Sequence, residues 1–167
     1  MTSQLCYSGD FTIGIDPGLS GAIAILPHDP AVAPVIADMP VRPYGEKGFV
    51  KRAVDVDALA DILKPYSVIG DTQAYLERVN AFPGQGSASM FSLGMSYWGV
   101  AGVLAALKIP LHLVEPKEWK GHFGLAKDKE LARALALRYY PGMELTRKKD
   151  HNRAEALLIA RYGREGK

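Results

Sequence analysis

The chain has 167 residues, 48% of them apolar and 23% charged, which is typical of one globular domain and excludes a disordered chain. Its one cysteine, Cys6, excludes an internal disulfide and fits a reducing compartment, and we expect neither a secretory signal nor a membrane span. The net charge of +2 is uneven, because residues 1–115 hold 7 basic and 11 acidic side chains and residues 116–167 hold 13 and 7. This basic final third indicates either a polyanion partner or solvated helix faces.

The first half of the chain predicts an antiparallel meander. We expect residues 1–10 to be a loose lead-in, and alternating apolar side chains over 11–16 indicate a strand. The Pro- and Gly-containing turn 17–21 leads into a second strand over 22–26, and a third is expected near 32–39.

A loop, a helix and a further strand follow the meander. Residues 40–52 carry two Pro, two Gly and mixed charge, so we expect a loop there. An apolar stripe predicts a helix over about 55–64, which Pro65 should end. Residues 74–79 are typical of a fourth strand.

The second half alternates helices with one strand. A helix over about 87–107 is apolar nearly all round and should be buried, and close packing on a sheet or on a partner subunit would explain its glycines 94, 99 and 102. Residues 111–115 predict a fifth strand, and shorter helices are expected near 116–121, 128–139 and 152–162. This order predicts one α/β domain over residues 1–167, with a mixed five-stranded sheet flanked by helices.

Four acidic residues occupy positions suited to chemistry. Asp16 ends the first strand, Glu77 lies in the fourth strand, and Asp150 and Glu155 lie at the start of the last helix, with His151 beside them. Each could merely cap a turn or helix, or pair with a cation. Together they would converge, and converging carboxylates favour Mg²⁺, which supports hydrolysis of phosphodiesters.

These residues carry a resemblance to a known family. The segments IGIDPGLSGAIAIL, LERV, EPKEWK and KKDHNRAEALLIA, in this order over residues 11 to 162, resemble the RuvC-type Holliday junction resolvases of the RNase H-like superfamily. The spacing near the last helix is similar to that of the branch containing chloroplast and phage-like resolvases. The resemblance implies an RNase H-like fold and a homodimer that cuts four-way DNA in paired symmetric nicks.

The resemblance also implies a metal site. Asp16 matches the first-strand ligand and would bridge two Mg²⁺ ions, with Mn²⁺ as a substitute. Glu77 matches the fourth-strand ligand, and the pair five residues apart, Asp150 and Glu155, completes the set. His151 is an accessory that could carry a proton, and whether Asp150 or the pair His151/Asn152 supplies the fourth ligand stays open. Water would attack the phosphodiester in line and leave a 5′-phosphate and a 3′-hydroxyl.

DNA contacts are expected from a loop and from the basic end. The set is Phe82, Gln85, Ser87, Ser89, Lys117, Lys120, Arg147, Lys148, Lys149 and Arg153. Trp119 is expected to pack in the core. The long helix, with Met90, Phe91 and Trp98, is a candidate homodimer interface or else monomer core.

The predicted function is therefore a Mg²⁺-dependent endodeoxyribonuclease that resolves four-way junctions in the cytoplasm or nucleoid, with no membrane partner and with a possible branch-migration motor. Three alternatives stay open: an RNase H-like nuclease acting on RNA–DNA hybrid or other branched DNA, an ATP-binding domain of the actin and sugar-kinase type, and a junction-binding module without activity. The second rests on DPGLSGAIAIL, which also resembles a phosphate-binding hairpin, but a second lobe is lacking. The complete carboxylate set argues against the third.

Overall fold

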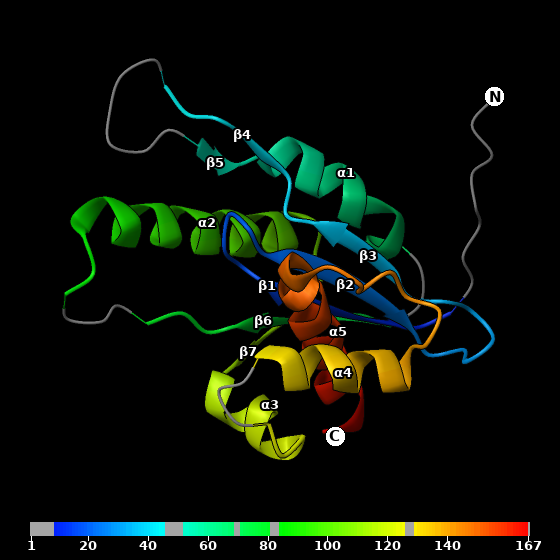
Figure 1. Ribbon diagram of the computed structural model, residues 1–167. Coiled ribbons are helices and arrows are strands. Elements are labelled where there is room, and N and C mark those ends of the chain that lie inside the picture. Colours follow the sequence, from blue (N-terminus) through cyan, green and yellow to red (C-terminus); the bar gives the residue numbers. More distant parts are fainter. Residues whose placement is uncertain (1–8, 46–51, 69–70, 81–83, 126–128, 167) are drawn as a thin grey trace.

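The computed structural model describes residues 9–45, 52–68, 71–80, 84–125 and 129–166, and its centre is a five-stranded sheet (Figure 1). The strands lie in the order β3-β2-β1-β6-β7. Their bounds are β1 Phe11–Asp16, β2 Ala22–Pro27, β3 Val35–Asp38, β6 Thr72–Glu77 and β7 Leu111–Val114. β1, β2 and β3 pair antiparallel, whereas β1, β6 and β7 are parallel. The predicted mixed sheet and its meander are confirmed.

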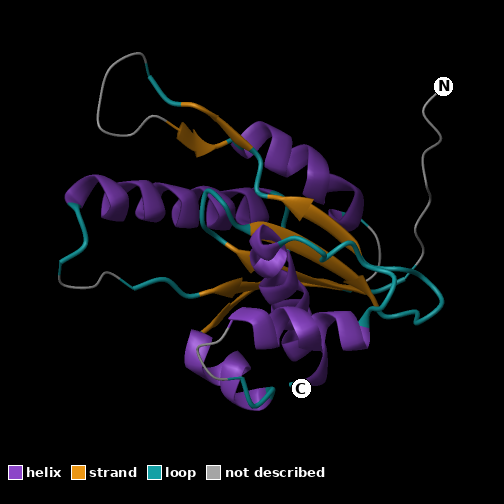
Figure 2. Ribbon diagram, viewed as in Figure 1, coloured by secondary structure: helices purple, strands orange, loops and turns teal. Residues whose placement is uncertain are grey.

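Helices cover both faces of this sheet, as Figure 2 shows. Their bounds are α1 Val56–Ser67, α2 Ser87–Ala106, α3 Pro116–His122, α4 Lys129–Tyr139 and α5 His151–Glu165, with a 3-10 turn at Lys148–Asp150 before α5. One apolar core joins α1 and α2 to one face of β1 and β2, and a second core joins α3, α4 and α5 to the other. The RNase H-like α/β class expected from the sequence agrees with this three-layer arrangement.

Gly14 in β1 allows α5 to lie directly on the sheet. Phe11, Ile13 and Ile15 face α1 and α2, so the residues between them face α5. A Cβ atom at Gly14 would lie 2.2 Å from the carbonyl oxygen of Ala156 and 2.3 Å from the backbone nitrogen of Ala160. The absent side chain therefore sets the height of α5 above β1, and with it the position of Glu155.

Two expectations about residues 40–65 were wrong. The predicted loop over 40–52 contains the strand β4 Val41–Pro43, and its last residue is the first of the strand β5 Arg52–Val54. The two strands pair in a small antiparallel sheet. Pro65 does not end α1 but lies inside its last turn. The proline is tolerated because it is solvent-exposed, while Tyr66 after it packs edge-on against Phe11 with ring centroids 5.1 Å apart.

The prediction that α2 is buried all round was also wrong. One side of the helix packs on α1, β5 and β7, whereas Phe91 and Trp98, seven residues apart on another side, are 59% and 73% exposed. Packing within the chain requires none of the three glycines: an added Cβ at Gly99 would lie at an ordinary 3.4 Å from Val56 Cγ1, and at Gly94 and Gly102 it would meet open space. Contrary to the sequence-based expectation, α2 has the length and apolar content of a membrane span, a test that core helices also pass.

Candidate active site

Three carboxylates gather at one end of the sheet. Asp16 and Glu77 end the adjacent parallel strands β1 and β6, whose paired residues run up to Ile15 and Leu76, so both acids lie at the same edge. Glu155 comes from the first turns of α5, which packs on β1. Burial raises the pKa of Glu77 to about 7, and the nearby Asp16 and Glu155 carboxylates add to the rise. Three of the four predicted acids therefore lie close enough to interact electrostatically, and their role as metal ligands stays a prediction.

Two neighbouring residues of α3 oppose this accumulation of negative charge. Trp119 Nε1 donates a hydrogen bond of 2.9 Å to Glu77 Oε1, and Lys120 Nζ lies 3.0 Å from Glu155 Oε1. Trp119 and Lys120 both lower the pKa of Glu77 and so favour its ionised form. Trp119 is fully buried, as its predicted packing role requires, and the sequence did not indicate its contact with Glu77.

The turn after β1 holds Asp16 in place. The backbone N–H of Gly18 donates to Asp16 Oδ1 over 3.4 Å, and the N–H of Gly21 donates to the Gly18 carbonyl over 2.8 Å. A Cβ atom at Gly21 would lie 2.1 Å from the Asp16 carbonyl oxygen, so this position excludes a side chain. The turn predicted at 17–21 is confirmed, and it leaves the Asp16 carboxylate at the edge of the sheet.

Asp150 is engaged differently from the other three acids. Its carboxylate is 2% exposed and accepts hydrogen bonds from the backbone N–H of Arg147 at 2.8 Å and from Arg147 Nη2 at 2.9 Å. These contacts hold the pKa of Asp150 below its ordinary value. Asp150 thus closes the turn that begins α5, the alternative role that its sequence position also allowed.

His151 and Asn152 follow Asp150 as the first two residues of α5. His151 begins α5, four residues before Glu155, so the two share a helix face as expected. His151 Nδ1 lies 2.9 Å from the Lys148 carbonyl oxygen, which places the ring proton on Nδ1 and the lone pair on Nε2 in the neutral imidazole. Asn152 Nδ2 donates to the carbonyl oxygen of Ser20, in the turn after Asp16.

The chemical type of these donors, but not their arrangement in this structure, suits a hard divalent cation. Carboxylate oxygens are the ligands that Mg²⁺ and Mn²⁺ prefer, and the mutual repulsion at Glu77 is of the kind that such a cation relieves. Within the described ranges, no three His, Cys, Asp or Glu side chains are arranged to hold a metal directly. Lys120 and Trp119 engage carboxylate oxygens there instead.

A polar cleft of about 480 Å³ adjoins the start of α5. Its charged lining comes from three basic residues and two acidic ones, Arg52, Arg147, Lys149, Asp38 and Asp150. The Ser20–Gly21 turn and His151 also line it. The cleft therefore joins the turn that follows Asp16 to cationic side chains, an arrangement suited to a phosphate backbone.

The other residues predicted to contact DNA fall into two groups. Lys117, Lys148 and Lys149 are exposed, as are Gln85, Ser87 and Ser89 around the start of α2. The second group is already paired with acids of the same chain. Arg153 forms two hydrogen bonds to Asp38, of 2.5 and 2.8 Å. Arg147 binds Asp150, and Lys120 binds Glu155. Phe82 lies outside the described residues.

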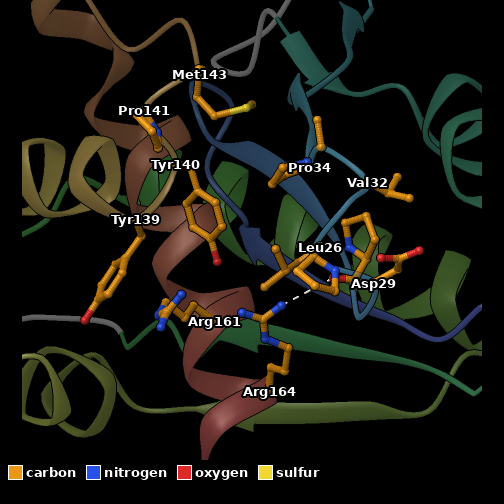
Figure 3. Close-up of a pocket in the computed structure, with 14 residues that line it drawn as sticks. Leu26, Asp29, Val32, Pro34, Tyr139, Tyr140, Pro141, Met143, Arg161 and Arg164 are labelled. Carbon is orange, nitrogen blue, oxygen red and sulfur yellow. Dashed lines mark hydrogen bonds between the residues drawn. The ribbon is translucent and has the colours of Figure 1, made fainter.

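A second cavity, of about 390 Å³, lies at the opposite end of β2 (Figure 3). Tyr140 and Met143 line one side, and the segment after Pro27 lines the other. Arg164 donates to the Pro27 carbonyl over 3.3 Å, and Arg161 pairs with Glu165. The cavity contains none of the predicted site residues.

Comparison with solved structures identifies the fold as that of RuvC, within the RNase H-like class. The structure of Thermus thermophilus RuvC in complex with a Holliday junction substrate matches with a TM-score of 0.58 and 15% identity, covering 93% of this chain and 96% of that one. A second structure of Thermus thermophilus RuvC matches with a TM-score of 0.55 and 18% identity over the same shares. The predicted fold class is confirmed.

Among curated proteins, the chain is similar to the chloroplastic Holliday junction resolvase MOC1 of Chlamydomonas reinhardtii. The two are 33% identical over 121 residues, which cover 66% of this chain and 13% of that protein, so the chain spans about an eighth of this relative's length. No family model matches the chain. The resemblance to RuvC-type resolvases, including their chloroplast branch, is thus confirmed by an independent fold match and sequence match.

Proposed function

We propose that the chain is a structure-selective endonuclease that hydrolyses phosphodiesters in opposed strands of a four-way DNA junction. The observation that carries this proposal is the convergence of Asp16, Glu77 and Glu155 at one end of an RNase H-like sheet. The basic cleft at the start of α5 provides a place for the DNA backbone beside them. The similar proteins named as RuvC and as a Holliday junction resolvase support the junction as substrate.

Asp16, Glu77 and Glu155 would hold the divalent cation, Mg²⁺ or Mn²⁺. When bound, the cation supplies activation of water and neutralisation of charge on the phosphate. For the fourth position we favour His151 over Asp150, because both oxygens of Asp150 accept hydrogen bonds from Arg147. The hydrogen bond from His151 Nδ1 to a backbone carbonyl is the orientation that metal-binding histidines use.

The protein's own residues supply binding and proton transfer. Lys148 and Lys149, exposed next to the cleft, bind DNA phosphates in this proposal, and Lys117 extends that surface along α3. As an alternative to the ligand role, the lone pair on His151 Nε2 can accept a proton from water. The turn at Gly18 orients Asp16 toward the reacting phosphate.

Paired cuts require two active sites, so we propose a homodimer. The exposed apolar surface of α2, formed by Met90, Phe91 and Trp98, is the candidate interface, because it is left uncovered in the single chain. A branch-migration motor stays a prediction of the resemblance. The chloroplast relative and the lone cysteine support action on DNA in a reducing compartment, whether organellar or cytoplasmic.

A cleavage assay tests the proposal. The purified chain would be incubated with a mobile four-way junction, a matched linear duplex or an RNA–DNA hybrid, each with Mg²⁺ or with EDTA. Paired symmetric nicks on the junction alone, abolished by EDTA, are expected, and Asp16→Asn or Glu155→Gln should remove them. Cutting of the hybrid alone would favour a different RNase H-like nuclease. Tight junction binding without any cutting by Mg²⁺ or Mn²⁺ would contradict the enzymatic role.

A further inference from the structure

Trp119 is buried in the core, and the acceptor that its indole N–H finds there is a predicted site residue. The indole is 0% exposed, packed among apolar side chains of the second core, and its only polar group is Nε1–H. That group donates over 2.9 Å to Glu77 Oε1. An indole N–H has one hydrogen to give, so the contact fixes the ring and one oxygen of the carboxylate together.

The backbone around this contact is fixed from both sides. Glu77 pairs with Val114 across the β6–β7 ladder, and the N–H of Arg78 donates to the Val114 carbonyl over 2.8 Å. The Arg78 guanidinium then binds Glu115, the residue before α3, at 2.9 Å. The end of the strand that carries Glu77 is thus joined to the start of the helix that carries Trp119.

We propose that Trp119 is a positioning residue for Glu77, holding Oε1 so that the second oxygen is presented to a divalent cation. The inference rests on the proposed role of Glu77 as a metal ligand. Groups that hydrogen-bond a metal ligand set its orientation, and their loss weakens metal binding roughly 10- to 100-fold. Removing the indole N–H should therefore weaken Mg²⁺ binding to the DNA-free protein by about tenfold or more.

The first test uses the unmodified side chain as a reporter. The chain has two tryptophans, Trp98 and Trp119, so its ¹⁵N spectrum should hold two indole N–H signals, which single Trp→Phe variants would assign. Titration with Mg²⁺ should shift the Trp119 indole signal to saturation, and the exposed Trp98 signal should stay in place. Glu77→Gln should move the metal-free Trp119 signal and abolish its response to Mg²⁺.

The second test measures affinity in two matched variants. Trp119→Phe keeps an aromatic ring in the core but removes the donor, and isothermal titration with Mg²⁺ should give a Kd at least tenfold weaker. Trp98→Phe should keep the wild-type Kd. The inference would be overturned by a wild-type Kd for a folded Trp119→Phe variant. It would also be overturned if the Trp119 indole N–H signal did not shift at saturating Mg²⁺. The signal test stands even if Trp119→Phe does not fold.

These outcomes separate the inference from the proposed function. A Trp119 signal that responds to Mg²⁺ in a protein that cuts no junction supports the positioning role and contradicts the resolvase proposal. Junction cleavage by a Trp119→Phe variant with unchanged metal affinity supports the resolvase proposal and contradicts the positioning role.

Discussion

Lys120 Nζ lies 3.0 Å from Glu155 Oε1, so α3 places an ammonium group against a carboxylate of α5 that is only 7% exposed. Lys120 also lies 4.9 Å from the centre of the Trp119 ring, a cation–π contact that keeps its stem along α3. A nearly buried carboxylate beside Asp16 and Glu77 is costly without a counter-charge. In the metal-free protein, Lys120 supplies that counter-charge.

Replacing Lys120 with Met should therefore destabilise the metal-free protein by about 1–3 kcal/mol, because Glu155 loses its cation while staying buried. Mg²⁺ should recover much of this loss, since a bound divalent cation neutralises the same carboxylate. Urea unfolding of both proteins in EDTA and in Mg²⁺ measures the two effects.

The matched control is Lys117→Met, an exposed lysine on the same helix, which should change stability by less than about 0.5 kcal/mol. An equal loss in EDTA and in Mg²⁺ for Lys120→Met would mean that the cation does not approach Glu155.

The raised pKa of Glu77 predicts that the stability of the metal-free protein depends on pH near neutrality. Its pKa is raised from 4.5 to about 7, so the folded state holds this proton more tightly than the unfolded state does. Stability is therefore full below about pH 4.5 and falls, by on the order of 1–3 kcal/mol, as the pH rises through 7. Asp150 and Asp38 have lowered pKa values and act below this window.

The measurement is urea unfolding in EDTA at pH 5 and pH 8, for the wild type and for Glu77→Gln. The free energy of unfolding of the wild type should fall between pH 5 and pH 8. That of Glu77→Gln should fall less, because the variant lacks the ionisation of residue 77. Equal losses would show that Glu77 ionises normally in the folded protein.

The sequence predicted the fold well because the strands carry strong local signals. Alternation over residues 11–16, the Pro- and Gly-containing turn after it and the later apolar runs each specify a strand or its end. The small sheet of β4 and β5 was missed because its three-residue strands are too short to show a period. The exposure of Trp98 was missed because the sequence of an apolar helix does not show whether each side packs against the same chain or against another protein.

The site was predicted in part for a similar reason. Asp16 and Glu77 end neighbouring parallel strands, and strand order can be inferred from an α/β pattern. The roles of Trp119, Lys120 and Arg147 depend on which atoms meet across α3, α5 and the turn before it, and no local pattern carries that information. The adjacent Trp and Lys in EPKEWK, soon after the strand that pairs with β6, were the available signal.

Asp150 and His151 should respond to substitution in opposite ways. Asp150→Asn weakens the contacts that Arg147 makes with a buried carboxylate, so stability should fall by about 1–3 kcal/mol while the Mg²⁺ affinity stays within a few-fold of wild type. His151→Gln should keep stability but slow junction cleavage by about 100-fold or more. Thermal unfolding, Mg²⁺ calorimetry and single-turnover cleavage separate the two. Loss of Mg²⁺ binding in Asp150→Asn would instead identify Asp150 as the fourth ligand.

Trp98 should decide the oligomeric state. Its side chain is 73% exposed on α2, so a charged residue there is harmless to a monomer and disruptive at an apolar interface. Sedimentation velocity should show a dimer for the wild type and a monomer for Trp98→Glu, with the Mg²⁺ affinity of the single site unchanged. Leu131→Glu, which alters an exposed apolar residue on α4, is the control and should stay dimeric. A monomeric wild type at micromolar concentration would refute the proposed interface.

Gly14 links the packing of the fold to the geometry of the site. Gly14→Ala would place a methyl group 2.2 Å from the Ala156 carbonyl oxygen, and because the neighbour is backbone, α5 must move away from β1. We expect a loss of about 3 kcal/mol in stability and a fall in junction cleavage larger than the unfolded fraction explains, since Glu155 moves with α5. Gly102→Ala, whose methyl group meets open space on α2, should instead gain up to about 1 kcal/mol. Urea unfolding with cleavage assays on the folded fraction measures both, and wild-type cleavage by Gly14→Ala would show that the site tolerates a shift of α5.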